Sequence, residues 1–481
     1  MPRHRGAGRF HSPYDFEGFV PSSASKRGEQ MRRYLASFGI LVAIAALGVA
    51  GFGSWIAYAR PELLSLASSY AAKIVCSNVF IAKRDVDSVI RTDVRLAEHG
   101  LDKLMKIDVD TAKQRVESSF LGLFAKRYAV FGEGRGCTLV SNDEFPAFAA
   151  APPLPPSAMP DALWPTGETS QPTNDPRLMV ALSDPALQGP GMRAIVVVHD
   201  GRIVGETYGQ GFTASTPLLG WSMTKTVNAV LVGMAIKDGK LWLDRKGLFP
   251  QWAGDARAGI SLADLMAMSS GLEWNEDRGL VNDPARMEFL VKDAVAFARD
   301  KELVAAPGTS FHYASGSAVL LARIWQNAIG STARTFPQER LFKTLGMTSA
   351  VFESDPSGTF LGEGFLYANA HDWARFGEFL RLGGEWNGQQ LLPPGFVDYM
   401  RSPAPASVGD QGPVYGRGQL WLARGLGFAL PDDTFMLNGH LRQTMTIIPS
   451  RKLVIVRMGL TPEDIGFSNA NLLSAIVAAT R

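Results

Sequence analysis

An apolar run near the N-terminus constrains the fold of this 481-residue chain more than any other feature. No Asp, Glu, Lys or Arg occurs between Arg33 and Arg60, and residues 35–57 are mostly apolar. This length matches one helix across a lipid bilayer. Alanines and glycines occur on every face of such a helix, which disfavours a buried core helix. We therefore predict a transmembrane anchor at residues 34–59.

The residues that flank this run predict its orientation. Residues 1–33 are polar and irregular, and their charged residues are mostly basic: Arg3, Arg5, Arg9, Lys26, Arg27, Arg32 and Arg33 against Asp15, Glu17 and Glu29. Such a tail stays in the cytoplasm while the rest of the chain crosses the membrane. Ala57-Tyr-Ala59 has the form of a signal-peptidase site, but the apolar run and its leader are both long for a signal peptide. We expect an uncleaved, single-pass anchor in a bacterial inner membrane, with the following domains in the periplasm.

Residues 60–145 are expected to form a small α+β domain that contains both cysteines of the chain, Cys76 and Cys137. In an oxidising compartment, such a pair is more often a disulfide than a metal site. We predict that these two residues form a disulfide, and two buried free thiols are the alternative. Residues 146–172 include a proline-rich stretch and are interpreted as an extended linker.

Net charge argues against one class of partner. The chain has 48 Lys and Arg against 46 Asp and Glu, a net charge of +2. This balance provides no argument for binding nucleic acid, and we expect no such partner. The length is sufficient for two or three domains and one large core.

Residues 173–481 are predicted to form one large domain, with strands at both ends and helices between them. Two strands, 194–199 and 202–208, flank the turn residues Asp200-Gly201, which is a hairpin signal. Further strands are expected at 435–437, 444–448 and 453–458, and helices at 262–272, 372–380 and from Asn469 onward. This order predicts one sheet whose edges come from both ends of the domain, covered by helices.

Residues 218–236 are interpreted as a loop that enters a helix with one apolar face. Ser222 and Lys225 are three residues apart, so both side chains project from the same side of the first turn. A buried, neutral amine at this position would accept the serine proton and make Ser222 a nucleophile. Ser23 and Lys26 have the same spacing, but they lie in the N-terminal tail, where no core positions them.

A second candidate element is the segment 306–321, a turn followed by a short extended piece and a helix. Tyr313 lies at the junction of loop and helix. A tyrosine beside a protonated lysine has a lowered pKa, and as a phenolate it relays protons. Ser315 offers a hydroxyl to a substrate or to Lys225. Tyr367 lies in a similar pattern but leads directly into a helix, so we assign it to packing.

A third candidate element is the stretch 435–443, which contains Gly439 and His440. An edge strand beside the nucleophile can donate one backbone N–H to the acyl oxygen. The N–H of Ser222 would supply the other donor of an oxyanion hole. A surface or packing role is the alternative for the His440 ring.

Together these motifs resemble the serine β-lactamase and penicillin-binding-protein superfamily. The resemblance lies in Ser222-Met-Thr-Lys225, Tyr313-Ala-Ser315 and the closing strand with Gly439, and Met268-Ser-Ser-Gly-Leu272 supports it. It covers about residues 173–481 and is closest to the class C-like branch, with esterases, D-alanyl peptidases and 6-aminohexanoate-oligomer hydrolases. It implies an α+β fold in which helices flank an antiparallel sheet, with a helical subdomain. It also implies an acyl-serine mechanism without metal or cofactor.

The resemblance also implies roles for individual residues. Ser222 would be the nucleophile, Lys225 the group that deprotonates it, and Tyr313 the general acid and base. Ser315 matches a position that asparagine or serine usually holds, and His440 would contribute its backbone N–H to the oxyanion hole beside Gly439.

One motif departs from the family pattern. The usual Lys-Thr-Gly falls on Leu437-Asn438-Gly439, so the carboxylate of a β-lactam loses its basic partner. Arg442 stands where glycine is common, and it either clamps a carboxylate or stays solvated.

The function expected from these residues is a membrane-anchored serine hydrolase. It would cleave an amide or ester of a small molecule or short peptide through an acyl-enzyme on Ser222. A D-alanyl-D-alanine-type cell-wall peptidase or β-lactamase is one alternative, which the missing basic residue disfavours. A non-catalytic acyl-binding or sensor domain is the other, although it would not need Ser222, Lys225 and Tyr313 together.

Overall fold

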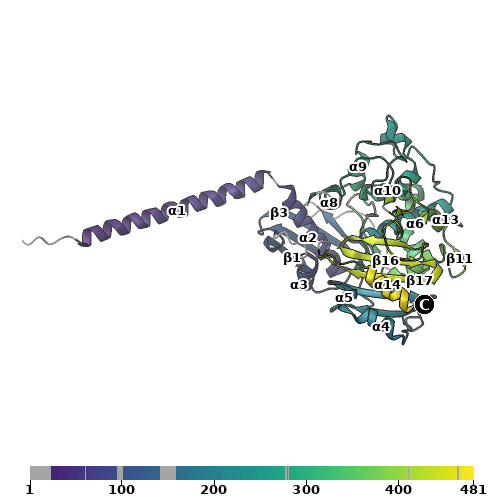
Figure 1. Cartoon of the computed structure of the whole chain (residues 1–481). Coiled ribbons are helices and arrows are strands. Elements are labelled where there is room, and N and C mark those ends of the chain that lie inside the picture. The colour runs from purple at the N-terminus through teal and green to yellow at the C-terminus, as the bar shows by residue number, and fades with distance from the viewer. Residues whose placement is uncertain are drawn as a thin grey trace, which may run out of the picture. The chain divides into compact units, whose positions relative to one another are not determined.

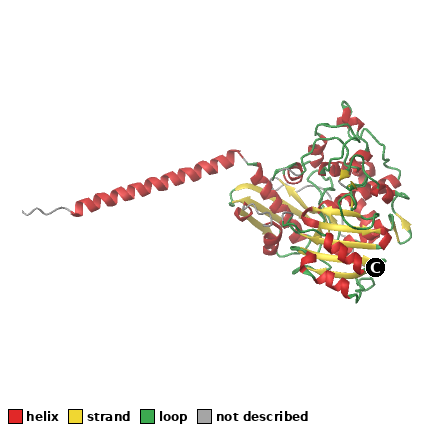
Figure 2. Cartoon of the chain, in the orientation of Figure 1, coloured by secondary structure: helices red, strands yellow, loops and turns green. Residues whose placement is uncertain are grey.

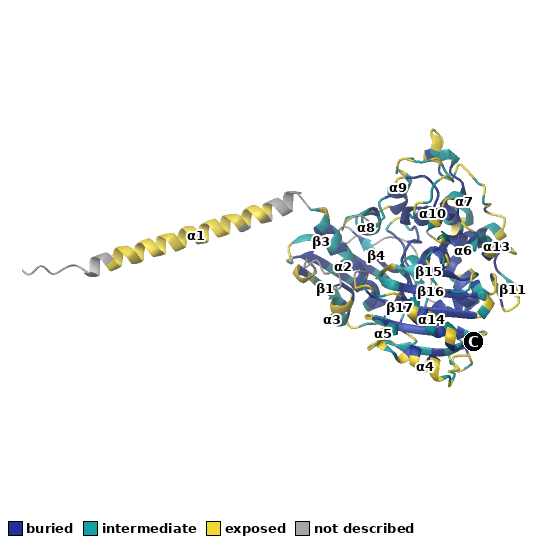
Figure 3. Ribbon diagram, in the orientation of Figure 1, coloured by how far each residue is buried: buried dark blue, intermediate teal, exposed yellow. Residues whose placement is uncertain are grey.

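The computed structural model describes residues 23–59, 61–94, 101–140, 159–276, 279, 281–409, 411–462 and 465–480. The chain divides into two compact units, Met1–Arg60 and Pro61–Arg481. In the first unit, residues Ser23–Ala59 form helix α1 (Figure 1). Within its segment Arg27–Phe52, an 18-residue window has a mean hydropathy of 2.3 and contains no buried residue (Figure 3). A helix of this kind near an N-terminus is a candidate membrane span or signal sequence, and the predicted anchor lies mostly within it.

A second helix, α2 (Glu62–Phe80), has sufficient length and hydropathy to span a membrane, but most of it is buried in the core of the second unit. It packs on an antiparallel sheet in the order β1 (Met105–Asp110), β2 (Arg115–Phe120), β3 (Phe124–Gly132) and β4 (Gly136–Val140). Cys76 on α2 and Cys137 on β4, which the sequence analysis pairs, form a disulfide. This α+β region belongs to the same compact unit as the large domain.

Part of the predicted linker, residues 159–172, lies within the described part of the chain and is packed there. Residues 146–158 lie outside the described part of the chain. In the segment 159–172, Trp164 is fully buried, and its indole N–H donates to the His371 carbonyl at 3.3 Å. Burial of this large aromatic ring therefore anchors residues 159–172 on the large domain.

His371 lies on helix α12 (Ala370–Arg381) and contacts two carboxylates, one from this segment and one from the main sheet. Its Nδ1 lies 3.1 Å from Glu168, and its Nε2 lies 2.7 Å from Glu206. Burial acts to lower the pKa of His371, but the two carboxylates outweigh it and raise the pKa from 6.5 to about 9. A group whose pKa is higher in the folded than in the unfolded state stabilises the protein fully at pH values below the unfolded-state pKa. This stabilisation is lost once the pH exceeds the folded-state pKa.

We therefore expect the free energy of unfolding to decrease between about pH 6.5 and about pH 9, as this imidazolium loses its proton. Urea denaturation across this range would measure the slope, and His371→Gln should show a smaller one. Equal slopes in the two proteins would contradict the assignment.

The main sheet has six antiparallel strands in the order β14-β15-β16-β17-β5-β6 (Figure 2). The strands are β5 (Met192–His199), β6 (Arg202–Tyr208), β14 (Trp421–Leu422), β15 (Phe435–Gly439), β16 (Gln443–Ile448) and β17 (Leu453–Gly459). The hairpin and the three later strands of the prediction are confirmed. Both residues of the hairpin turn, Asp200 and Gly201, have positive φ, as a two-residue turn of this kind requires.

Alternate side chains of the central strands pack on opposite faces of this sheet. On β5, Val196 and Val198 belong to the large core that includes α12, whereas Ile195 and Val197 contact a second cluster. Helices α4 (Pro176–Ser183) and α14 (Ala470–Ala479) cover that second face. Because both faces of the sheet are covered, the five consecutive residues 194–198 of β5 are all apolar.

Helix α3 (Val86–Val89) follows α2 in the chain. The other α-helices and strands lie largely between β6 and β14. They are α5 (Pro185–Gln188), β7 (Leu218–Leu219), α6 (Thr224–Lys237), α7 (Leu262–Met266), α8 (Asp283–Phe289), α9 (Ala294–Arg299), α10 (Ser315–Ile329), α11 (Lys343–Leu345), β8 (Val351–Phe352), β9 (Leu366–Ala368), β10 (Glu385–Trp386), β11 (Gln389–Gln390), α13 (Phe396–Arg401), β12 (Val408–Gly409) and β13 (Gly412–Pro413). The helix expected at 262–272 ends at Met266, because the chain turns through positive φ at Met268 and Gly271.

Candidate active site

Ser222 lies on a single 3-10 turn, η3 (Trp221–Met223), between strand β7 and helix α6. Trp221 has a φ of 48°, a left-handed conformation that is strained for a residue with a side chain. The Gly220 N–H donates to the Leu366 carbonyl at 2.9 Å and fixes the start of the turn. Ser222 itself is only half-buried, while Met223 and the residues that follow are buried. The turn therefore leaves the serine accessible at the end of a buried helix.

Lys225 follows one turn later, and its side chain is almost fully buried. Its Nζ donates to the Ser222 Oγ at 2.9 Å and to the Ser315 Oγ at 3.1 Å. A third hydrogen bond runs to the Glu363 carbonyl at 2.9 Å. Three acceptors from three parts of the chain thus hold the ammonium group beside the serine hydroxyl.

Tyr313 comes from the loop before α10 and completes this arrangement. The Lys225 Nζ lies 5.0 Å from the centre of its ring, and its hydroxyl interacts with both Ser222 and Lys225. The ring stacks on Trp421 at 5.4 Å and meets Tyr415 edge-on at 5.8 Å. The structure thus brings together the three side chains that the sequence analysis singled out, with an aromatic wall beside them.

The protonation state of Lys225 differs from the neutral amine that the sequence analysis expected. Burial acts to lower its pKa, but electrostatic interactions with the Tyr313 hydroxyl and with the carboxyl groups of Glu276 and Glu363 together outweigh burial. The pKa of Lys225 is therefore above its ordinary value, and the resting group is an ammonium.

The pKa of Tyr313 also departs from the expectation of a lowered value. Burial of the ring raises it more than the charge of Lys225 and the contacts with Lys225 and Ser222 lower it, and Glu276 raises it further. The resting group is therefore a neutral phenol, because desolvation disfavours the phenolate.

Glu276 is a residue of the site that sequence reasoning missed. The Ser315 Oγ donates to its carboxylate at 2.6 Å, the Ser315 N–H donates at 2.8 Å, and the Trp274 indole N–H donates as well. Ser315 therefore connects Lys225 to a carboxylate. The signal available in the sequence was weak, since Glu276 lies in a loop just beyond the Met268–Leu272 phrase.

Glu363 is a second residue that sequence reasoning missed. Its carbonyl accepts from Lys225, and its side chain is almost fully buried. Burial raises the pKa of its carboxyl to about 8. No local pattern marks a buried carboxylate of this kind, because a lone glutamate in a glycine-rich loop is typically solvated.

Gly439, at the end of β15, passes very close to the turn that carries Ser222. A Cβ on this residue would lie 2.4 Å from the Gly220 carbonyl oxygen, so only glycine permits the approach. The neighbouring His440 is exposed, and its ring meets Trp221 edge-on at 5.4 Å. The third predicted element therefore lies beside the turn that carries the nucleophile, and the His440 ring packs on Trp221 of that turn.

Leu437 and Arg442, the two residues that depart from the family pattern, have contacts outside the catalytic group. Leu437, which stands in place of the usual lysine, is buried in the core of the domain. The Arg442 backbone carbonyl accepts from Arg457 at 2.9 Å. The decoy Tyr367 is fully buried on β9, as expected for a packing residue. The decoy pair Ser23 and Lys26 lies in α1, within the other compact unit.

Comparison with known families identifies the domain that carries this site. The sequence profile of the Beta-lactamase family matches residues 181–470, which is more than half of the chain. The chain belongs to the beta-lactamase family. Members of this family are typically serine hydrolases, and this membership supports a hydrolase activity on amides or esters.

Solved structures with the beta-lactamase fold agree with this membership. A Bacillus anthracis protein described as a 6-aminohexanoate-dimer hydrolase is 23% identical, with a TM-score of 0.53 over 69% of this chain and 89% of its own. A penicillin-binding-protein homologue from Caulobacter crescentus is 15% identical, with a TM-score of 0.52 over 65% and 99%. EstCE1, a hydrolase with promiscuous acyltransferase activity, is 16% identical, with a TM-score of 0.51 over 63% and 97%. No curated protein matches the sequence of this beta-lactamase-family chain.

Proposed function

We propose that the chain is a serine hydrolase that cleaves an amide or ester bond through an acyl-enzyme on Ser222. The observation that carries this proposal is the 2.9 Å contact between the Lys225 ammonium and the Ser222 hydroxyl, with the Tyr313 phenol interacting with both. A nucleophile, a cation and a phenol held together by packing form the arrangement that acyl transfer requires.

The proposed reaction has two halves. In the first, the Ser222 Oγ bonds to the substrate carbonyl carbon, and the bond from that carbon to the leaving group breaks. The serine proton passes to the Lys225–Tyr313 pair, and Tyr313 returns a proton to the leaving group. In the second half, water bonds to the acyl carbon and gives a proton to the same pair. The bond from that carbon to the Ser222 Oγ then breaks, and the pair returns the proton to the Oγ.

This reaction needs the Lys225–Tyr313 pair to have lost one proton. Because the pKa of each group lies above its ordinary value, the reactive form is a small fraction at neutral pH. Its population increases with pH, so the proposed activity is greatest in alkaline solution.

The substrate class follows from the walls of the site. The partly exposed ring of Tyr313, which interacts with Ser222, stacks on the partly exposed ring of Trp421, and this aromatic pair suits an apolar acyl group. Leu437 provides no cation for a carboxylate near the bond to be cut. We therefore favour an ester or amide without that carboxylate over a β-lactam or a D-alanyl peptide. A small amide such as the substrate class named for the Bacillus anthracis protein fits this description.

The proposal includes an uncleaved membrane anchor at residues 34–59, with the hydrolase domain in the periplasm. The basic tail, the apolar helix α1 and the Cys76–Cys137 disulfide support it. Carbonate extraction of membranes, followed by the intact mass of the retained chain, tests it. A mature N-terminus just after Ala59 would contradict the anchor.

Intact mass spectrometry tests the acyl-enzyme. The full chain in detergent would be exposed in parallel to a fluorophosphonate, a panel of p-nitrophenyl esters and a β-lactam, and the modified peptide would be sequenced. We expect one adduct per chain, on Ser222. With the esters, a burst of nitrophenol followed by steady release indicates turnover, whereas one equivalent without turnover would favour the sensor alternative. Modification at another residue would overturn the assignment of Ser222.

A further inference from the structure

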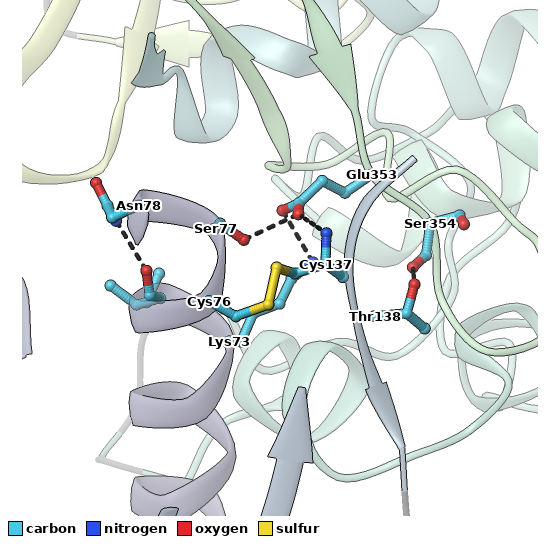
Figure 4. Close-up of a disulfide and its surroundings, with 9 residues drawn as sticks. Lys73, Cys76, Ser77, Asn78, Cys137, Thr138, Glu353 and Ser354 are labelled. Atoms are coloured by element: carbon cyan, nitrogen blue, oxygen red, sulfur yellow. Dashed lines mark hydrogen bonds and ion pairs between the residues drawn. A yellow bond between two sulfur atoms is a disulfide. The ribbon is translucent and has the colours of Figure 1, made fainter. Parts of the chain in front are cut away.

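Glu353 is a buried carboxylate that no step of the proposed reaction uses. It directly follows β8 and has no exposed surface. The Lys73 Nζ forms an ion pair with it at 2.8 Å, and the Ser77 hydroxyl donates to it at 2.9 Å. The Cys137 N–H donates to the same carboxylate (Figure 4). All of these donors come from a region more than 200 residues earlier in the chain.

The disulfide joins the two halves of this carboxylate-binding site. Lys73 and Ser77 lie on α2, on either side of Cys76, whereas Cys137 lies on β4. The Lys73 Nζ also donates to the Cys137 carbonyl, so the two halves are connected by a hydrogen bond as well as by the disulfide (Figure 4). An intact bridge therefore keeps the donors at the spacing that Glu353 requires.

The segment that begins at Glu353, residues 353–366, also supports the active site. The Glu353 N–H donates to the Phe365 carbonyl at 2.9 Å, so the two ends of the segment lie side by side. The Phe365 ring packs on Trp221 at 5.9 Å, and the Lys73 Nζ lies 4.8 Å from the centre of the same ring. Trp221 is the strained residue immediately before the nucleophile.

Two backbone carbonyls of the segment hold the catalytic groups directly. The Glu363 carbonyl accepts from Lys225, and the Leu366 carbonyl accepts from the Gly220 N–H. A shift of this segment would therefore move the ammonium group and the start of the nucleophile turn together.

We propose that Glu353 is a positioning residue, and that helix α2 and strand β4 serve to hold the segment 353–366 in its active arrangement. This inference rests on the proposed acyl-serine function. A buried ion pair of this kind fixes geometry more than it adds net stability. Displacement of catalytic groups by a fraction of an ångström to about 1 Å lowers the rate by up to about a hundredfold.

The first test is Glu353→Gln in the full chain, assayed with p-nitrophenyl acetate. We expect kcat to fall about tenfold while KM changes less than about twofold, because the displaced groups act in the transition state. The matched control is Glu378→Gln, which removes another buried carboxylate, paired with Arg381 at 2.6 Å, near the Asp200-Gly201 hairpin. The control should keep kcat within about twofold of the wild type. Unchanged kcat in Glu353→Gln, or an equal loss in the control, would overturn the proposal.

The double variant Lys73→Met with Glu353→Gln serves if the single variant fails to fold, because it leaves no uncompensated buried charge. It should show the same loss of kcat.

Reduction of the disulfide by dithiothreitol should slow the wild type severalfold and add little in the double variant, because the two changes disrupt one structure. Independent, multiplying effects of reduction and substitution would overturn the proposal.

The rate of Ser222 labelling separates this proposal from the function on which it rests. In Glu353→Gln, we expect a fluorophosphonate to reach one adduct on Ser222 per chain, but about tenfold more slowly than in the wild type. Wild-type chain that is not labelled on Ser222 at all would instead refute the acyl-serine function. Labelling of the variant at the wild-type rate would refute only the positioning role.

Discussion

Replacement of Ser222 by alanine should lower kcat for p-nitrophenyl acetate by about a thousandfold or more, because no other group in the site can form the acyl intermediate. The side chain is half-buried, so the loss of one oxygen should leave the fold and the thermal midpoint nearly unchanged. Steady-state kinetics and a thermal melt measure the two effects.

The matched control for this variant is Ser23→Ala, which removes the serine of the other Ser-x-x-Lys sequence. Helix α1 holds that serine in the other compact unit. Its replacement should leave kcat unchanged. Near-normal hydrolysis by Ser222→Ala would rule out the nucleophile assignment.

Replacement of Tyr313 by phenylalanine should lower kcat about a hundredfold, the usual contribution of a positioned general acid and base. The ring would keep its contacts with Trp421 and Tyr415, so the lost phenol accounts for the change.

The pKa of Tyr313 and that of Lys225 are both raised, so wild-type kcat should still increase with pH at about pH 9. A pH–rate profile measures this rise.

Tyr399→Phe is the control for the phenol. The hydroxyl of Tyr399 interacts with Arg417, and its loss should change kcat less than about twofold. A wild-type rate that is already constant above about pH 7 would contradict the raised pKa values of Lys225 and Tyr313, because a plateau there requires an ordinary or lowered pKa.

The main sheet and the nucleophile helix were predictable because each has a local signal. The Asp200-Gly201 turn predicted its hairpin, and the three-residue spacing placed Ser222 beside Lys225. The approach of Tyr313 followed from the family resemblance rather than from any local pattern, since it brings together residues about 90 positions apart.

The missed features depend on tertiary burial, which one sequence does not encode locally. The ammonium state of Lys225 results from Tyr313, Glu276 and Glu363, three groups from separate loops. The packed segment around Trp164 required knowledge of its partners on α12. In each case the deciding interaction joins residues that are far apart in the chain, so propensity and spacing could not reveal it.

The central pairing of β5 with β17 has a consequence for biosynthesis. The two strands meet residue for residue, from Val198 opposite Val454 to Ala194 opposite Met458, yet more than 250 positions separate them. Until the ribosome has released β17, one edge of β5 lacks its native neighbour. This unpaired apolar edge can pair with strands of other chains and promote aggregation. Such remote pairing slows folding, so we expect this edge of β5 to stay unpaired until the last strands have been made.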